Sequence, residues 1–143
     1  MSSAHFRISS EYENVGTICA DILQLVSANV SEQKANEVHI GLSEALNNVI
    51  EHSYQERSGQ PIEVECNVDP SAIVINISDF GNGMSEDAFL ARPAELCIDD
   101  PDDLESLPEG GMGIALIKSC MDKTSYSRGG REHGNRLTLV KNR

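Results

Sequence analysis

The hydrophobic positions alternate between helical and strand-like spacing, and they predict a β-α-α-β-β-α-β-β order of elements. A short alternating stretch over residues 5–9 predicts an edge strand, and apolar residues three and four apart predict a helix over 12–27. Ser31 is a good N-cap for a second helix, which we expect to end near Ser58 and Gly59. The apolar stripe of this second helix comprises Val38, Leu42, Ala45, Leu46 and Val49.

The second half of the chain is richer in strand-like patterns. Residues 62–68 alternate between apolar and polar side chains, and 73–77 are almost continuously apolar, so these two stretches predict a hairpin. We expect a third helix after the glycines at 110–113 and a closing hairpin of 124–127 and 136–140. Long helices combined with hairpin strands favour an α+β fold. The expected architecture is a two-layer α/β sandwich with a mixed, mostly antiparallel sheet and helices on one face.

Length and composition place the chain among globular domains. Its 143 residues predict one domain spanning 1–143, and 39% hydrophobic with 24% charged residues is ordinary for a globular protein. No apolar run approaches the ~20 residues of a membrane span, and the first ten residues contain no signal-type apolar segment. The expected location is therefore the cytoplasm. The four cysteines form no CxxC pair, which favours free thiols over a zinc site.

The chain is strongly acidic, with 23 Asp and Glu against 11 Lys and Arg and a net charge of −12. This excess disfavours nucleic acid and anionic membranes as partners, because phosphate binding needs clustered basic residues. Seven of the acids fall between residues 92 and 109, together with three prolines. A connection this long is typical of a functional lid or a disordered insert. Its charge suits either plain solvation or the docking of a basic partner, which would be salt-dependent.

The second helix carries a candidate chemical stripe. Glu44, Asn48 and His52 are spaced four residues apart, so they share one helical face. A carboxylate and an amide on one face can orient a nucleophile and hold Mg²⁺, which prefers oxygen ligands and keeps several waters. A solvated polar face of a surface helix shows the same pattern. Taken alone, the stripe leaves both interpretations open.

Two glycine-rich motifs follow. Asp79, Gly81, Gly83 and Met84 come directly after the most apolar strand, and Gly-Gly-Met-Gly at 110–113 opens the third helix. Glycines permit close approach of a ligand to the backbone, and free N–H groups at a helix start attract phosphate. Each motif alone also fits an ordinary turn or hinge. No Lys-Ser or Lys-Thr follows the glycines and no βαβ unit is predicted, so a Walker P-loop and a Rossmann fold are excluded.

The three motifs together are more specific than any one of them. In this order, Glu-x-x-x-Asn on a helix, Asp-x-Gly-x-Gly after a strand and Gly-Gly-x-Gly before a helix resemble the GHKL (Bergerat-fold) ATPases. The chain most resembles the small stand-alone anti-sigma-factor serine kinases of bacterial partner-switching systems. The resemblance covers nearly the whole chain. It is closest in SEALNNVIEH, from residue 43, and in GGMGIALIKSCMD, from residue 110.

The resemblance implies a role for each matching residue. Glu44 would be the general base that activates a serine, Asn48 the Mg²⁺ ligand, and Asn47 a further contact near the phosphates. Asp79 would accept a hydrogen bond from the amino group of adenine. Gly81, Gly83 and Met84 would shape the pocket around the base. The resemblance also implies an acidic ATP lid at about 92–113, whose phosphate-contacting backbone belongs to Gly110, Gly111, Met112 and Gly113.

The resemblance further implies a function. The chain would be an ATP-dependent and Mg²⁺-dependent protein serine kinase that phosphorylates a STAS-domain anti-anti-sigma protein. It would also bind a sigma factor or an equivalent output protein. Members of the family often dimerise, which leaves a homodimer open. A non-catalytic, nucleotide-gated protein-binding switch is the alternative.

Two departures from the family pattern bear on that alternative. Some members carry an arginine just before the lid glycines, where this chain has Pro108 and Glu109. The nearest basic residues along the sequence are Arg92 and Lys118. Asn135 stands where the family commonly has threonine before the last strand, and its amide offers a hydrogen bond near the adenine. The missing arginine puts phosphoryl transfer in question rather than nucleotide binding.

Overall fold

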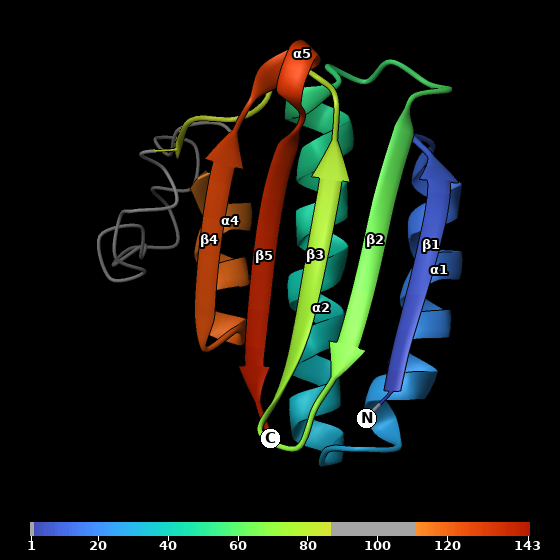
Figure 1. Cartoon of the computed structure of the whole chain (residues 1–143), viewed down its shortest axis with the longest axis vertical. Coiled ribbons are helices and arrows are strands. Elements are labelled where there is room, and N and C mark those ends of the chain that lie inside the picture. The colour runs from blue at the N-terminus through green and yellow to red at the C-terminus, as the bar shows by residue number, and fades with distance from the viewer. Residues whose placement is uncertain (1, 87–110) are drawn as a thin grey trace, which may run out of the picture.

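The sheet has five strands in the order β1-β2-β3-β5-β4, and helices cover one of its faces (Figure 1). The computed structural model describes residues 2–86 and 111–143. All four strand pairings are antiparallel, so the predicted α+β sandwich is confirmed, and its sheet is antiparallel throughout rather than mixed. The strands are β1 (Ser2–Ser9), β2 (Pro61–Val68), β3 (Ala72–Asp79), β4 (Lys123–Arg128) and β5 (Asn135–Asn142).

The three longer helices of the described chain pack on the same face of the sheet (Figure 1). They are α1 (Tyr12–Ser27), α2 (Glu32–Asn48) and α4 (Gly111–Cys120). Two short elements were not predicted. A π-helical turn, η1 (Val49–Ser53), continues α2, and α5 (Gly130–His133) joins β4 to β5. Otherwise the predicted order of elements is confirmed.

The core lies between the sheet and these helices. Alternate residues of β2 and β3 point into it, and they meet the apolar stripes of α1 and α2. Three of the four cysteines, Cys19, Cys66 and Cys120, are buried and free, and burial raises the pKa of Cys19 and Cys66 to about 11. The fourth, Cys97, lies outside the described residues. Fully buried core side chains include Ile18, Ile22, Leu42, Leu46, Ile62, Ile73, Ile75, Ile77 and Leu137.

The start of α2 is as predicted, because the Ser31 hydroxyl accepts a hydrogen bond from Lys34 N at 3.2 Å and satisfies an otherwise unpaired donor. The predicted end near Ser58 and Gly59 is wrong, because the helical run stops at Ser53. The final turn is a wide π turn, and π turns of this kind recur at functional sites.

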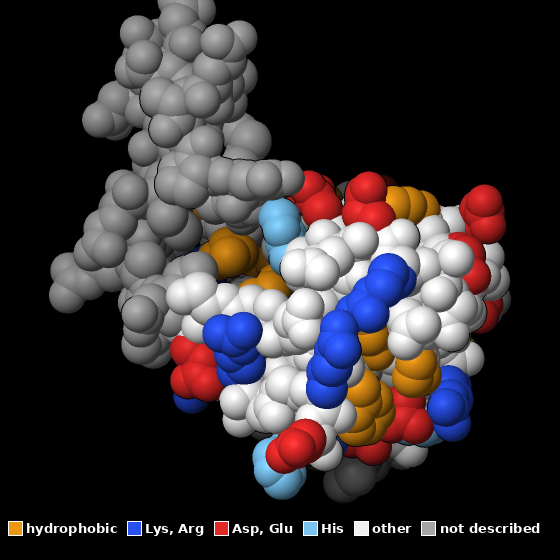
Figure 2. Space-filling model, turned by 90° about the horizontal axis from the view of Figure 1, so that it is seen from above, with side chains coloured by type: hydrophobic (Ala, Val, Ile, Leu, Met, Phe, Trp, Pro, Cys, Tyr) orange, Lys and Arg blue, Asp and Glu red, His pale blue; other side chains and the backbone are white. Residues whose placement is uncertain are grey.

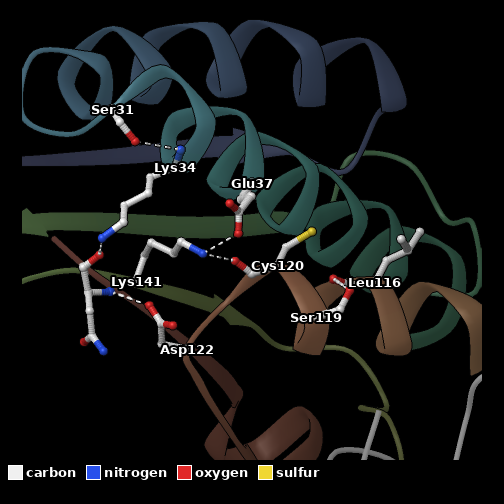
Figure 3. A network of polar contacts seen from close by, with 9 residues as sticks. Ser31, Lys34, Glu37, Leu116, Ser119, Cys120, Asp122 and Lys141 are labelled. Atoms are coloured by element: carbon white, nitrogen blue, oxygen red, sulfur yellow. Dashed lines mark hydrogen bonds and ion pairs between the residues drawn. The ribbon is translucent and has the colours of Figure 1, made fainter. Parts of the chain in front are cut away.

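The C-terminal end of α4 is anchored to its neighbours by a buried lysine (Figure 3). Lys141 of β5 is 6% exposed, and its ammonium donates to Glu37 of α2 at 2.6 Å and to the Cys120 carbonyl at 2.7 Å. A positive charge is favourable at this end of a helix, where backbone carbonyls are unpaired. The three elements are therefore fixed to one another at this point.

Helix α4 is already formed at Gly111, so the prediction that it begins after Gly113 is wrong. Glycines are tolerated in a first helical turn, and sequence patterns locate helix ends only approximately. Gly110 and the acidic segment at 92–109 lie outside the described residues. Within the described residues, no helix combines the length and apolar character needed to cross a membrane.

Candidate functional site

The stripe on α2 faces the first turn of α4. A Cβ placed on Gly113 would lie 3.2 Å from Oε2 of Glu44 and 3.2 Å from both terminal atoms of the Asn48 amide. The carboxylate, the amide and the glycine helix start are therefore neighbours in space. Two motifs that are far apart in the sequence meet here, and the interpretation of the stripe as a plain solvated face is not supported.

Asn48 has an unmet hydrogen-bonding requirement. Its side chain is 4% exposed, and Nδ2 has no hydrogen-bond partner among the described residues. A buried polar group without a partner costs free energy, and such groups recur where a ligand supplies the missing contact. The unpartnered Nδ2 can donate only to an acceptor, such as a phosphate oxygen. The Asn48 Oδ1 is a hard oxygen donor of the kind that Mg²⁺ prefers, so Asn48 fits a magnesium ion whose shell waters and phosphate oxygens would complete.

Asp79 forms the centre of the second part of the site. It is 1% exposed at the end of β3, and its Oδ1 accepts three hydrogen bonds. The donors are the Ser53 hydroxyl at 2.5 Å, Gly81 N at 2.9 Å and Asn135 Nδ2 at 2.9 Å. None of these three bonds involves Oδ2. A carboxylate that is held by one oxygen can offer the other oxygen to an N–H group of a ligand.

The glycine loop after β3 fits tightly around Ser53. A Cβ on Gly81 would lie 2.4 Å from the Ser53 carbonyl oxygen, so only glycine fits there. Gly83 has a φ of +82°, which a residue with a side chain rarely adopts, and its N–H donates to the Ser53 hydroxyl at 3.0 Å. Asn82 N donates to the Ser53 carbonyl at 2.8 Å. Ser53 therefore organises the loop, although no motif in the sequence pointed to it.

Two tyrosines, the buried Tyr54 and the half-buried Tyr126, hold the rest of this loop. Phe80 N donates to the Tyr54 hydroxyl at 2.8 Å, and Met84 N donates to the Tyr126 hydroxyl at 2.8 Å. Burial raises the pKa of Tyr54 and raises that of Tyr126 to about 12, and the Asp79 carboxylate adds to both shifts. Both hydroxyls therefore keep their protons at neutral pH. Met84 is itself buried as part of the hydrophobic core.

Arginines lie beside the same loop. Arg128 Nε donates to the Asn82 carbonyl at 2.9 Å, and Arg131 Nε donates to the Asn82 side chain at 3.1 Å. Figure 2 shows this end of the molecule, where basic side chains are exposed among acidic ones. Sequence reasoning considered only Arg92, which lies outside the described residues, and Lys118. Lys118 lies seven residues beyond Gly111, about 10 Å further along α4 at 1.5 Å per residue.

The two parts of the site are joined by η1. Asn48 ends α2 and Ser53 ends η1, so the Glu44–Asn48 pair and the Asp79 network are joined by one continuous helical run. Asn47 is half-buried on α2 and makes no hydrogen bond to either part within the described chain. Gly111 begins α4, and only the backbone of Met112 is described.

A five-stranded antiparallel sheet with helices on one face is the architecture expected of an α+β sandwich ATPase fold. The chain belongs to the histidine kinase-like ATPase domain family, because the model of that family matches residues 8–141. The family resemblance carried by the three motifs is thereby confirmed.

Curated relatives refine the comparison. Serine-protein kinase RsbW of Halalkalibacterium halodurans is 32% identical over 87 residues, which are 61% of this chain and 51% of that protein. The chain thus spans about half the length of this relative. Proteins of the same name are 28% identical over 137 residues in Staphylococcus aureus (94% of this chain, 83% of the relative) and 30% identical over 107 residues in Bacillus cereus (71% and 65%).

Proposed function

We propose that the chain is a protein serine kinase that uses ATP and Mg²⁺. Its substrate would be a serine of a STAS-type anti-anti-sigma protein, and its second partner a sigma factor or an equivalent output protein. The observation that carries the proposal is the meeting of Glu44 and Asn48 with Gly113 at the start of α4. The similarity to proteins named serine-protein kinase RsbW supports the choice of serine.

The nucleotide would lie across the two parts of the site. Oδ2 of Asp79 accepts a hydrogen bond from the amino group of adenine, and Gly81, Gly83 and Met84 line the base. Backbone N–H groups of the first turn of α4, from Gly111 to Gly113, donate to the phosphates, and Gly110, which lies outside the described residues, is expected to contribute as well. In a chain of net charge −12, such oriented dipoles are an important source of positive potential.

The proposal assigns a role to each reacting atom. The serine oxygen attacks the γ-phosphorus, Glu44 accepts the hydroxyl proton, and the bond from the γ-phosphorus to its bridging oxygen breaks to release ADP. Asn48 would hold Mg²⁺, which when bound neutralises charge on the phosphates, with Asn47 close to the same groups. Phosphoryl transfer depends mainly on positioning and charge stabilisation, and the proposal assigns both to these residues.

Calorimetric titration with ATP and ADP, with and without Mg²⁺, tests the nucleotide site. The wild type should bind both nucleotides more tightly with Mg²⁺, and Asn48→Ala should remove most of that gain. Thr138→Val is a matched control, because Thr138 bonds Asn76 at 2.7 Å between β5 and β3, away from α2. Absence of nucleotide binding by the wild type would contradict the proposal.

A non-catalytic, nucleotide-gated switch is the second candidate, favoured by Pro108 and Glu109 where some family members have an arginine. Glu44→Gln separates the two functions, since a switch without chemistry needs no base. If the chain is a kinase, Glu44→Gln should keep its ATP affinity and lose the transfer of labelled phosphate to a STAS-domain protein. Equal and negligible transfer by wild type and variant would favour the switch.

A further inference from the structure

The orientation of the Asn135 amide is determined by its neighbours. Asn135 is 1% exposed, and its Nδ2 donates to Asp79 Oδ1 at 2.9 Å and to the Gly81 carbonyl at 3.0 Å. Its Oδ1 accepts from Gly130 N at 2.9 Å. A flipped amide would set its oxygen against two acceptor oxygens, so only one orientation satisfies all three contacts.

The proton of the Ser53 hydroxyl is assigned in the same way. Gly83 N donates to this oxygen at 3.0 Å, which leaves the hydroxyl hydrogen for Asp79 Oδ1 at 2.5 Å. Oδ1 therefore receives a hydroxyl, an amide and a backbone N–H, from η1, β5 and the loop. Three donors from three segments fix the plane of the Asp79 carboxylate. They also determine which oxygen is left for a ligand, namely Oδ2.

We propose that Asn135 and Ser53 are positioning residues that set the preference of the site for a 6-aminopurine over a 6-oxopurine. The inference rests on the proposed nucleotide site. A 6-amino group donates to a fixed acceptor such as Oδ2 of Asp79. A 6-oxo group brings a second acceptor against that oxygen, and a buried mismatch of this kind is costly. If the carboxylate were free to rotate away from the base, this discrimination would weaken.

Binding of Mg²⁺-ADP and Mg²⁺-GDP to the wild type, Asn135→Thr and Asn135→Val tests the proposal. Threonine and valine have nearly the same shape, but only threonine retains a donor for Asp79. We expect Asn135→Thr to keep most of the ADP-to-GDP affinity ratio and Asn135→Val to reduce it about tenfold or more, the scale of one hydrogen bond to a charged group. Ser53→Ala should lower the same ratio. Thr138→Val, which removes a hydroxyl from the same strand, should leave it unchanged.

Each outcome distinguishes the inference from the function on which it rests. A wild type that binds neither nucleotide overturns both. If the wild type prefers ADP and Asn135→Val shows the same ADP-to-GDP affinity ratio, the inference is overturned but the proposed function is not. Equal losses in Asn135→Thr and Asn135→Val also overturn it, because packing rather than hydrogen bonding would then be responsible. Thermal unfolding shows whether each variant is folded, and Ser53→Ala decides the matter if the Asn135 variants are not.

Discussion

Nζ of Lys141 lies 2.6 Å from Oε2 of Glu37, although 104 residues separate them in the chain. The same ammonium caps the end of α4 through the Cys120 carbonyl. Helix α4 carries Gly113 at its other end, against Glu44 and Asn48. Lys141 therefore helps to place the helix that forms one side of the candidate site.

Replacing Lys141 by methionine should destabilise the protein. Methionine fills a similar volume but donates nothing to Glu37 or to the Cys120 carbonyl, so we expect a loss of about 1–3 kcal/mol in the free energy of unfolding, measured with urea. Lys34→Met is the matched control, because Lys34 donates to a carbonyl of β5 from an exposed position and should cost less than about 0.5 kcal/mol. Equal losses in the two variants would show that the buried contacts of Lys141 add no more to the free energy of unfolding than the exposed contact of Lys34.

Glu37 should make stability depend on pH in the acid range. The hydrogen bond from Lys141 lowers the pKa of Glu37 below its ordinary value of 4.5. A carboxyl group with a lowered pKa contributes stability that is present above 4.5 and is lost as the pH falls through the folded-state value. Glu37→Gln should therefore lose less stability than the wild type on acidification, and Asp21→Asn, at an exposed position of α1, should behave as the wild type. Parallel acid profiles for Glu37→Gln and the wild type would contradict this.

Gly113→Ala should weaken nucleotide binding without unfolding the protein. The new methyl group would lie 3.2 Å from Glu44 and Asn48, so one of them must shift. Alanine favours the helix by about 1 kcal/mol over glycine. This gain offsets the steric strain in the free energy of unfolding, but it does not restore the affinity for nucleotide. Gly16→Ala in α1 has nothing within 4 Å and should only stabilise. Calorimetry with Mg²⁺-ADP should give a several-fold loss for Gly113→Ala alone, and unchanged affinity would place the nucleotide elsewhere.

The tyrosines should resist ionisation in the folded protein. Burial raises the pKa of Tyr126 to about 12 from an ordinary value of 10.0. Because the folded-state pKa is raised, the corresponding stability is present below pH 10 and is lost between pH 10 and pH 12. Tyr126→Phe should remove part of this loss, and should also accelerate amide exchange at Met84, whose N–H loses its acceptor. Absorbance titration of the folded and urea-unfolded chain measures the shift, and coincident curves would exclude it.

Local patterns in the sequence were sufficient for the elements and for the identity of the motifs. Burial on one face imposes a period of 3.6 on α2 and a period of 2 on β2, so both were predicted from the sequence alone. The order of Glu44, Asn48, Asp79 and the helix-opening glycines was sufficient to indicate the family. The end of α2 was not predicted, because a π turn and the positive φ of Gln55 and Glu56 leave no periodic signal.

Only the tertiary structure determined how Asn135 supports the candidate site and that Ser53 belongs to it. Asn135 reaches Asp79 because the register of β5 against β3 pairs those two residues. Ser53 reaches the same oxygen because it ends η1 next to Asp79, the last residue of β3. Hydrogen bonds between distant segments depend on strand register and helix placement, and neither leaves a periodic trace in the sequence. The sequence by itself therefore determined the chemical groups of the site, whereas the fold decided how those groups are oriented.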